Sequence, residues 1–409
     1  MMNFIKLGWR NILKNRRRSL ITVLAVALGF ASINLFSGYI HNVYDGLAEQ
    51  AIRGEGLGHL TLMKPGLLKE GKLEPEKFLL KSDEIQRITG LLSQDETVRL
   101  VTPRLAVSGI VSNGKVSTIF LGEGMVPEDM AVIRGDFRAD RGGALDRARP
   151  AAAAFASDLA DMLGLKQNDY AVLVASTVEG LTNALDVDVG ELYNTGNAGT
   201  NDKMLLLPFA FAQRLYDTEG ADRLIVLLRD RAQTFEAQLR LSEKLRAAGL
   251  NLEIKTWLEL SSFYKQVKGL FDMIFAFIFA IVIVIVMMSI INTMSMAVVE
   301  RTREIGTLRA LGMRRWDISW LFSVEGVLLV VLGGLVGVAL TLVLAWVVNQ
   351  AGFSYVPPNN TDAVLLQVDV VPWVMLQAFL FLGLVAALAA LLPARRAARM
   401  VIVDAMGHV

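Results

Sequence analysis

Residues 298–319 read VVERTREIGTLRALGMRRWDIS. This stretch is dense in charge, yet it lies between two strongly apolar runs, Met273–Val299 and Gly326–Val348. Two further uncharged runs are Leu20–Tyr39 and Val370–Ala394. Each run reaches the roughly 20 residues that a helix needs to cross about 30 Å of hydrocarbon. The sequence therefore predicts four membrane-spanning helices.

The composition of the 409 residues supports a membrane protein, because 53% of them are hydrophobic. A net charge of +1 gives no general attraction to nucleic acid, so no nucleic-acid partner is expected. The chain has no cysteine, which excludes disulfides and thiolate metal sites, and its three histidines lack the spacing of metal ligands. We expect no metal and no directly bound cofactor.

The distribution of basic residues orients the spans. Residues 1–19 carry six basic side chains and no acid, whereas the link at 349–369 carries only the acids Asp362 and Asp369. Because basic loops stay on the cytoplasmic side, both termini and residues 300–317 are expected there. The first apolar run follows three arginines and could be a signal peptide, but its length and the lack of a clear cleavage site favour a span.

The predicted fold is an α-helical membrane domain with four transmembrane helices, plus a large α+β periplasmic domain inserted between helices 1 and 2. The expected boundaries are a cytoplasmic amphipathic helix at 1–19, spans at 20–42, 271–299, 317–348 and 370–394, the periplasmic domain with its stalk at 43–270, a cytoplasmic helix at 300–316, a short periplasmic loop at 349–369 and a cytoplasmic tail at 395–409.

The periplasmic segment is long enough for two lobes and has recognisable local patterns. Asn113–Gly114 lies between two alternating strands and predicts a tight hairpin. Residues 222–257 read as strand, helix and strand, which implies neighbouring parallel strands. Residues 186–202 are polar and rich in Gly and Asn, so we expect a solvated hairpin tip. Residues 257–273 predict a helix that runs without a proline into the second span.

Catalytic motifs are missing from the sequence. There is no G-x-x-x-x-G-K-[ST] phosphate-binding loop, no G-x-S-x-G nucleophile elbow and no H-E-x-x-H metal helix. The 409 residues therefore cannot bind ATP through a P-loop, and we expect no enzymatic activity.

The charged stretch is expected to form a short amphipathic helix that ends at Gly312. One interpretation is a clamp onto anionic lipid, which needs only the arginines. The other is a docking helix whose apolar side chains enter a groove on a cytoplasmic protein. Acids interleaved with the arginines favour docking. The candidate docking residues are Glu300, Arg301, Arg303, Glu304, Ile305, Leu308, Arg309 and Gly312.

Two further features lie in the third span. Glu325 is an acid at membrane depth, which is costly unless it is paired or reached by water. We expect either a bond to Arg314 or Arg315 that stiffens the joint with the charged stretch, or a snorkelling or protonated side chain. Gly333 and Gly337 form a G-x-x-x-G face, which permits close helix packing within the subunit or across a dimer.

Several motifs carry a family resemblance. The segments ERTREIGTLRALGMRRWDI (300–318), EGVLLVVLGGLVGV (325–338) and LLPARRAARMVIVDAM (391–406) resemble the MacB/FtsX-like permease superfamily of ABC transporters. So do DLADMLGLKQND (158–169) and STVEGLTNALDVDVGE (176–191) in the periplasmic segment.

The resemblance implies a coupling helix at residues 300–315 that docks on an ABC ATPase, present in two copies, which uses the ATP and Mg. The ATPase stroke would reach the periplasmic domain by mechanotransmission through the stalk. The expected partners are that ATPase, a second permease in a homo- or heterodimer, membrane lipid, and a periplasmic carrier or adaptor. The expected location is a bacterial, Gram-negative inner membrane. The expected cargo is lipoprotein for release, with a MacB-like pump or an FtsX-like regulator of cell-wall hydrolases as alternatives.

Overall fold

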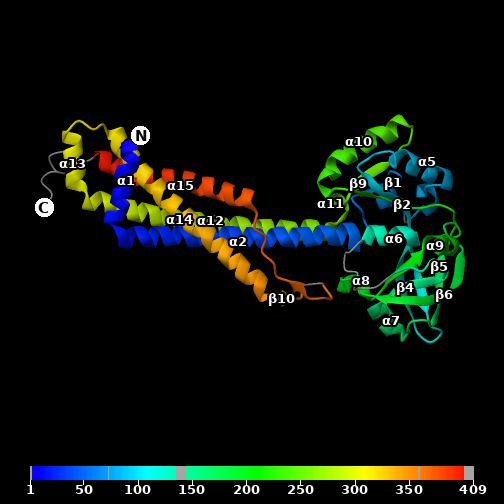
Figure 1. Ribbon diagram of the computed structural model, residues 1–409. Helices are drawn as coiled ribbons and strands as arrows, with labels where there is room; N and C mark the ends of the chain where they lie inside the picture. The colour runs from blue at the N-terminus through cyan, green and yellow to red at the C-terminus, as the bar shows by residue number, and fades with distance from the viewer. Residues whose placement is uncertain (1, 72, 135–143, 358–359, 400–409) are drawn as a thin grey trace. The chain divides into compact units, whose positions relative to one another are not determined.

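The computed structural model describes residues 2–71, 73–134, 144–357 and 360–399. The chain forms two compact units, whose elements are labelled in Figure 1. The membrane unit comprises Met1–Tyr44, Val267–Ser354 and Leu365–Val409, and the external unit comprises Asp45–Gln266 and Tyr355–Val364.

Four helices in the described part of the chain are long and apolar enough to cross a membrane, as predicted. The helices that contribute to the membrane unit are α1 (Met2–Lys14), α2 (Arg16–Glu49), α12 (Ser262–Glu300), α13 (Thr302–Ala310), α14 (Arg315–Ala351) and α15 (Pro372–Arg399). Helix α2 continues into a π-helical turn, η1 (Gln50–Gly54). Of the tail predicted at 395–409, residues 400–409 lie outside the described residues.

The core of the membrane unit joins α1 to all four long helices. Buried apolar side chains from each of them meet there, among them Ile12, Phe30, Ile290, Phe322 and Leu382. The first helix is therefore part of the bundle. It is separated from α2 by a turn at Asn15 and does not merely extend the first span.

Local backbone conformation sets the ends of α13. Arg301 leaves the helical region (φ −112°, ψ 17°), which separates α13 from α12. Gly312 has φ +98°, a left-handed conformation that glycine adopts without strain. Its N–H donates to the Arg309 carbonyl at 3.0 Å, and the Met313 N–H donates to the Leu308 carbonyl at 3.1 Å. The prediction that Gly312 ends this helix is confirmed.

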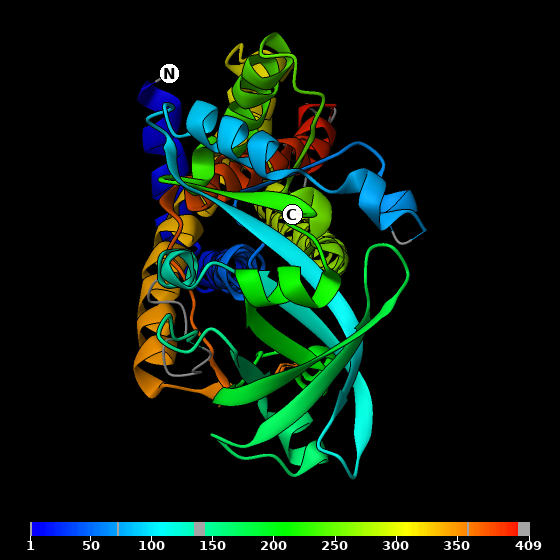
Figure 2. The ribbon, with the colours of Figure 1, turned by 90° about the vertical axis from the view of Figure 1, so that its right-hand side faces the viewer.

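The external unit is an α+β domain built on one sheet (Figure 2), as predicted for the segment between the first two spans. The strand order among the described residues is β3-β7-β4-β6-β5-β2-β8-β1-β9, and β3 also pairs with β2, so that six strands close into a ring. The strands are β1 (Leu60–Met63), β2 (Val98–Ser112), β3 (Ser117–Met125), β4 (Ala152–Ala156), β5 (Tyr170–Ser176), β6 (Thr182–Tyr193), β7 (Met204–Pro208), β8 (Arg223–Leu228) and β9 (Glu253–Thr256).

Strand β2 serves two hydrophobic cores, because its first half pairs with β8 and its last residues pair with β5. One core consists of side chains from the strands of the ring together with Leu159 and Phe211. The other consists of side chains from β1 and β8 together with Ile88 and Leu241. The external unit thus has two lobes.

The remaining elements are α3 (Leu67–Glu70), α4 (Pro75–Phe78), α5 (Ser82–Leu92), α6 (Pro127–Arg134), α7 (Ser157–Leu163), α8 (Ala198–Asn201), α9 (Phe209–Tyr216), η3 (Arg231–Gln233), α10 (Thr234–Ala247), α11 (Trp257–Leu260), β10 (Ser354–Tyr355) and β11 (Val364–Leu365).

Of two local patterns predicted for the external unit, the structure confirms the hairpin and contradicts the neighbouring parallel strands. The hairpin at Asn113–Gly114 is confirmed, with Gly114 at φ +84° between β2 and β3. Strands β8 and β9 are not neighbours, because β1 lies between them and pairs antiparallel with both. The β-α-β pattern could not reveal this insertion, since β1 comes from the distant segment that follows the first span.

Two other expectations were wrong. Residues 186–193 belong to β6, in which Val187, Val189 and Tyr193 are buried between polar residues, and residues 198–201 form α8. The helix expected over 257–273 is interrupted at Ser261, whose backbone is extended at ψ 95°. Its hydroxyl accepts a hydrogen bond from the Tyr264 N–H at 3.3 Å, which favours a fresh helix start at Ser262.

Candidate functional site

The candidate site is α13 and the turn that follows it, between α12 and α14. Its apolar side faces the membrane unit itself. Ile305 is 3% exposed and belongs to the core of the bundle, and Leu308 and Met313 are partly buried against that core. Ile305 is therefore a core residue of the membrane unit and is not accessible to another protein, whereas Leu308 is partly exposed and its docking role stays a prediction. An amphipathic pattern does not distinguish the subunit's own core from a partner's groove.

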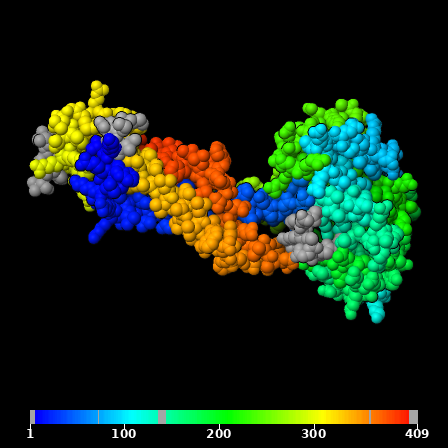
Figure 3. Space-filling view, in the orientation of Figure 1, coloured from blue at the N-terminus to red at the C-terminus, as the bar shows by residue number. Residues whose placement is uncertain are grey.

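The opposite side of this element is exposed. Leu311 is 80% exposed and Trp316 is 68% exposed, and Arg303, Glu304 and Arg315 are also exposed. These five side chains come from α13, from the turn that follows it and from the start of α14, and we call them together the outer surface of α13. Figure 3 shows this part of the chain, in yellow, at the surface of the membrane unit. The outer surface combines two large apolar groups with charges of both signs, a composition suited to contact with another protein.

Arg301 is buried at the start of α13 and contacts three side chains. Its Nε lies 2.8 Å from Glu304 Oε2, and its Nη1 lies 3.3 Å from Glu325 Oε2. Its guanidinium carbon lies 5.7 Å from the centre of the Phe322 ring. The hydrogen bond from Arg301 also lowers the pKa of Glu304. The side chain of Arg301 therefore bonds within the subunit and is not accessible to a docking protein.

Glu325 is 4% exposed and accepts hydrogen bonds from Arg301 and from Asn11 Nδ2, at 3.2 Å. The expected partners Arg314 and Arg315 were wrong. Arg315 lies ten residues before Glu325 on the same helix, which places it about 15 Å away along the axis, beyond side-chain reach. The sequence placed an acid at this depth, but the arginine that meets it comes from the α12–α13 junction.

Helix α1 packs against α14 beside this pair. A Cβ built on Gly8 would lie 3.0 Å from Leu328 Cδ1, and Ile12 is buried. Glu300, expected on the docking face, instead forms an ion pair with Arg18 at the start of α2. Glu325 thus joins α1 and α14 to the α12–α13 junction, and the separate Arg18–Glu300 pair joins α2 to α12. The sequence pattern did not reveal either connection.

The glycine face of α14 packs within the subunit. A Cβ on Gly333 would lie 2.6 Å from Val26 Cβ, and one on Gly337 would lie 2.9 Å from Phe30 Cδ1. Both neighbours lie on α2. Of the two arrangements that the sequence left open, these glycines adopt packing within the chain.

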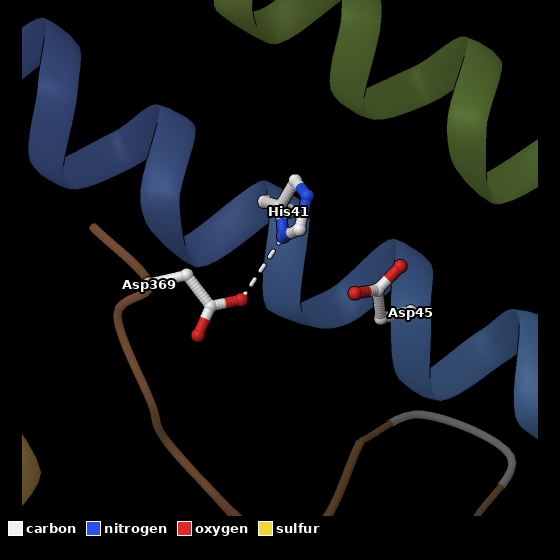
Figure 4. Close-up of side chains that lie close together, drawn as sticks. All are labelled: His41, Asp45 and Asp369. Atoms are coloured by element: carbon white, nitrogen blue, oxygen red, sulfur yellow. Dashed lines mark hydrogen bonds and ion pairs between the residues drawn. The ribbon is translucent and has the colours of Figure 1, made fainter. Parts of the chain in front are cut away.

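A further contact joins the other end of α2 to the approach to α15. His41 Nδ1 lies 3.0 Å from Asp369 Oδ2 (Figure 4), and the Asp369 N–H donates to the Gly38 carbonyl at 3.2 Å. Asp45, one turn further along α2, forms an ion pair with Arg231 at 2.6 Å. Because Arg231 already neutralises the Asp45 carboxylate, we assign no metal site here.

Comparisons with known proteins identify both parts of the chain. Residues 19–244 match the family described as MacB-like periplasmic core domain, and residues 276–402 match the family described as FtsX-like permease C-terminal.

Curated relatives include the macrolide export ATP-binding/permease protein MacB of Shewanella sp. (strain ANA-3), 38% identical over 29% of this chain and 16% of that protein. The MacB protein of Neisseria gonorrhoeae is 23% identical over 83% of this chain and 52% of that protein. The chain thus spans about half the length, or less, of these relatives. The crystal structure of the periplasmic region of MacB from Actinobacillus actinomycetemcomitans, 14% identical, covers 52% of this chain and 95% of its own at a TM-score of 0.38. The chain belongs to the MacB/FtsX-like permease superfamily.

Proposed function

We propose that this chain is a permease subunit that transmits the stroke of a partner ABC ATPase to its external unit without binding ATP itself. The names of the curated relatives pair an ATP-binding part with a permease, and the 409 residues contain no P-loop. Two ATPases would act on two permeases, and the outer surface of α13 would be the docking face.

The observation that carries this proposal is the anchoring of α13. Its inner side is fixed by Ile305 in the core and by the Arg301–Glu325 pair, while Leu311 and Trp316 stay exposed. A force on the outer surface is therefore transmitted to the bundle, because α13 cannot move independently of it.

The helix lengths fit such a relay. The apolar helices Arg16–Gly54 and Ser262–Glu300 each contain 39 residues. At 1.5 Å per residue each is about 58 Å long, roughly twice the hydrocarbon thickness. Both helices therefore extend well beyond the membrane and lead into the external unit.

For the cargo, we propose lipoprotein extracted from the outer leaflet of the bacterial inner membrane and passed to a periplasmic carrier. This interpretation rests on the resemblance of residues 158–169 and 176–191 to the periplasmic core of the lipoprotein-releasing members of the superfamily. The second candidate is export through a periplasmic adaptor and an outer-membrane channel, which the names of the curated relatives favour. Loss of the protein would trap lipoproteins in the inner membrane in the first case and raise sensitivity to macrolides in the second.

The docking face and the orientation can be tested with a matched pair of exposed leucines. Leu311 is 80% exposed on the outer surface, and Leu73 is 83% exposed in the external unit. Since the chain has no cysteine, Leu311→Cys and Leu73→Cys each introduce a single thiol. A membrane-impermeant maleimide added to intact spheroplasts should label Leu73→Cys and leave Leu311→Cys unlabelled. Labelling of Leu311→Cys would overturn the proposed orientation.

Docking is tested with charge substitutions at the same positions. Tagged wild-type chain, isolated in mild detergent from its native host, should carry copurifying ATP hydrolysis. Leu311→Asp should reduce that activity about tenfold or more, as expected when a buried apolar anchor is lost from an interface, and Leu73→Asp should not. Retention of the ATPase by Leu311→Asp, or ATP hydrolysis by the isolated chain without a partner, would overturn the proposal.

A further inference from the structure

The external unit contains a cavity that none of the functions above uses. Its volume is about 260 Å³. Its walls include Gln50 and Arg53 from η1, Arg104 from β2, Arg134 from the end of α6, and Tyr193 from β6. Three of the fifteen described residues that line it are arginines, and buried arginines are uncommon unless they are paired.

Arg104 is the most deeply buried of these arginines, at 2% exposed. Its Nε and Nη2 have no hydrogen-bond partner among the residues that the structure describes. Its Nη1 lies 3.9 Å from Glu123 Oε2. Burial lowers the pKa of Arg104 to about 10, which reflects a charge with too little compensation. Nε and Nη2 form one edge of the guanidinium, and such an edge binds the two oxygens of a carboxylate in parallel.

Tyr193 supplies a second buried polar group without a partner. It is 4% exposed, and its hydroxyl has no hydrogen-bond partner within the described ranges. The Arg134 guanidinium lies over its ring at 5.4 Å. Burial raises the pKa of Tyr193, so the hydroxyl keeps its proton and can donate it in a hydrogen bond. Buried tyrosine hydroxyls usually find an acceptor, and Tyr193 is one of the residues that line the cavity.

The acids beside the cavity compensate the charge of Arg104 only in part. Glu123 faces the cavity, but its carboxylate already forms an ion pair with Arg223. Glu55 also lines the cavity, and burial raises its pKa, which favours the neutral acid. Asp222 is a second acid that acts on Arg104, and it also forms an ion pair with Arg223. Glu123 and Asp222 therefore share their charge between two buried arginines, and Arg134 adds a further positive charge at the wall of the cavity.

We propose that this cavity binds a small carboxylate ligand, held by the Nε–Nη2 edge of Arg104 and by the hydroxyl of Tyr193. Arg134 contributes further positive charge at the same wall. The ligand supplies acceptor oxygens to the buried donors that the protein leaves unpaired at Arg104 and Tyr193.

The position of the cavity gives such a ligand a means to act on the permease. Gln50 and Gly54 in its wall belong to the turn that continues α2. Another part of the wall, at Thr195, adjoins Asn194, which accepts a hydrogen bond from Thr361 Oγ1 and donates to Asp362 Oδ1 at 3.0 Å. Ligand binding would therefore stiffen both the end of the first long helix and the connection between α14 and α15.

Thermal unfolding of the full-length chain in detergent tests the site. Sodium acetate or sodium succinate is titrated against sodium chloride at equal ionic strength and pH 7, and the dissociation constant is taken from the rise of the unfolding midpoint. We expect carboxylate-dependent stabilisation of the wild type. Tyr193→Phe should bind about tenfold more weakly, and Arg104→Lys, which lacks the bidentate edge, should bind more weakly still.

Tyr193→Phe is the deciding variant because it removes a hydroxyl that has no hydrogen-bond partner among the described residues. Its midpoint without ligand should not fall, so weaker binding cannot be explained by misfolding. The matched control is Tyr170→Phe, since Tyr170 lies in the same lobe, is 73% exposed and does not line the cavity. The proposal is overturned if neither carboxylate stabilises the wild type more than chloride does, or if Tyr193→Phe is stabilised as much as the wild type.

Discussion

Nη1 of Arg301 lies 3.3 Å from Oε2 of Glu325, and the two residues bracket the whole of α13. Both side chains are buried, and the same guanidinium binds Glu304 on α13. The pair therefore ties the start of α13 to α14. A helix held in this way transmits displacement to the bundle.

Glu325→Gln should weaken this link while the protein still assembles. The glutamine amide keeps a hydrogen-bonding oxygen but loses the charge, and Glu304 still compensates Arg301. We expect a loss of about 1–3 kcal/mol in the free energy of unfolding and fewer transport events per ATP hydrolysed. The measurement is transport and ATP hydrolysis in vesicles reconstituted with the partner ATPase.

The control for Glu325→Gln is Glu300→Gln. Glu300 pairs with Arg18 at the surface, with 38% of its side chain exposed, so its loss should change stability by less than about 1 kcal/mol and leave coupling intact. Equal coupling in Glu325→Gln and the wild type would show that the buried pair has no role in transmission.

Ile305 should behave as a core residue and not as a docking residue. Ile305→Ala removes packed methyl groups from a site that is 3% exposed, so we expect a loss of about 2–5 kcal/mol in stability. Leu311→Ala, at a site that is 80% exposed, should change stability by less than about 0.5 kcal/mol. Denaturant titration of both variants in detergent distinguishes them. A stable Ile305→Ala with lost ATPase binding would reverse these assignments.

The sequence predicted well those features that a local physical constraint determines. The hydrocarbon thickness sets the length of the apolar run that a span needs, so the four long apolar helices could be predicted from the sequence. The turns at Gly312 and Gly114 could be predicted because glycine adopts left-handed backbone without strain. Each of these signals lies within a few neighbouring residues.

Features that depend on long-range packing were missed. The insertion of β1 between β8 and β9 joins segments more than 150 residues apart. Arg301, not Arg315, meets Glu325 because α12 and α14 are neighbours in space, which helical spacing along one element does not show. The unpaired donors of Arg104 and Tyr193 come from different strands, and neither has a local sequence signature.

Gly333→Ala should disrupt the packing of α14 on α2. The added Cβ would lie 2.6 Å from Val26 Cβ and 3.0 Å from the Val23 carbonyl oxygen, so the helices must separate. We expect a loss of about 1–3 kcal/mol in stability, as for other overpacked sites. Gly383→Ala on α15 is the control, since nothing lies within 4 Å of its added Cβ. Equal thermal midpoints for the two variants would show that close packing at Gly333 is dispensable.

His59 should make the external unit less stable in mild acid. It is 4% exposed, its Nδ1 accepts a hydrogen bond from the Leu228 N–H at 2.9 Å, and burial lowers its pKa to about 4. The unfolded chain, with an ordinary histidine pKa of about 6.5, takes up this proton first as the pH falls. The folded state is therefore fully stable above about pH 6.5 and loses stability as the pH falls toward 4, by about 2 kcal/mol at pH 5.

His59→Asn should remove this pH dependence, because the asparagine oxygen can still accept the Leu228 N–H but does not titrate. Denaturant unfolding of the wild type and the variant, followed by fluorescence at pH 7.5 and pH 5, gives the comparison. The wild type should lose more stability than the variant across this interval, and carboxylates contribute little because most of them titrate below it. If both proteins lose the same amount, the protonation of His59 is not the cause, and another buried group must carry the acid sensitivity.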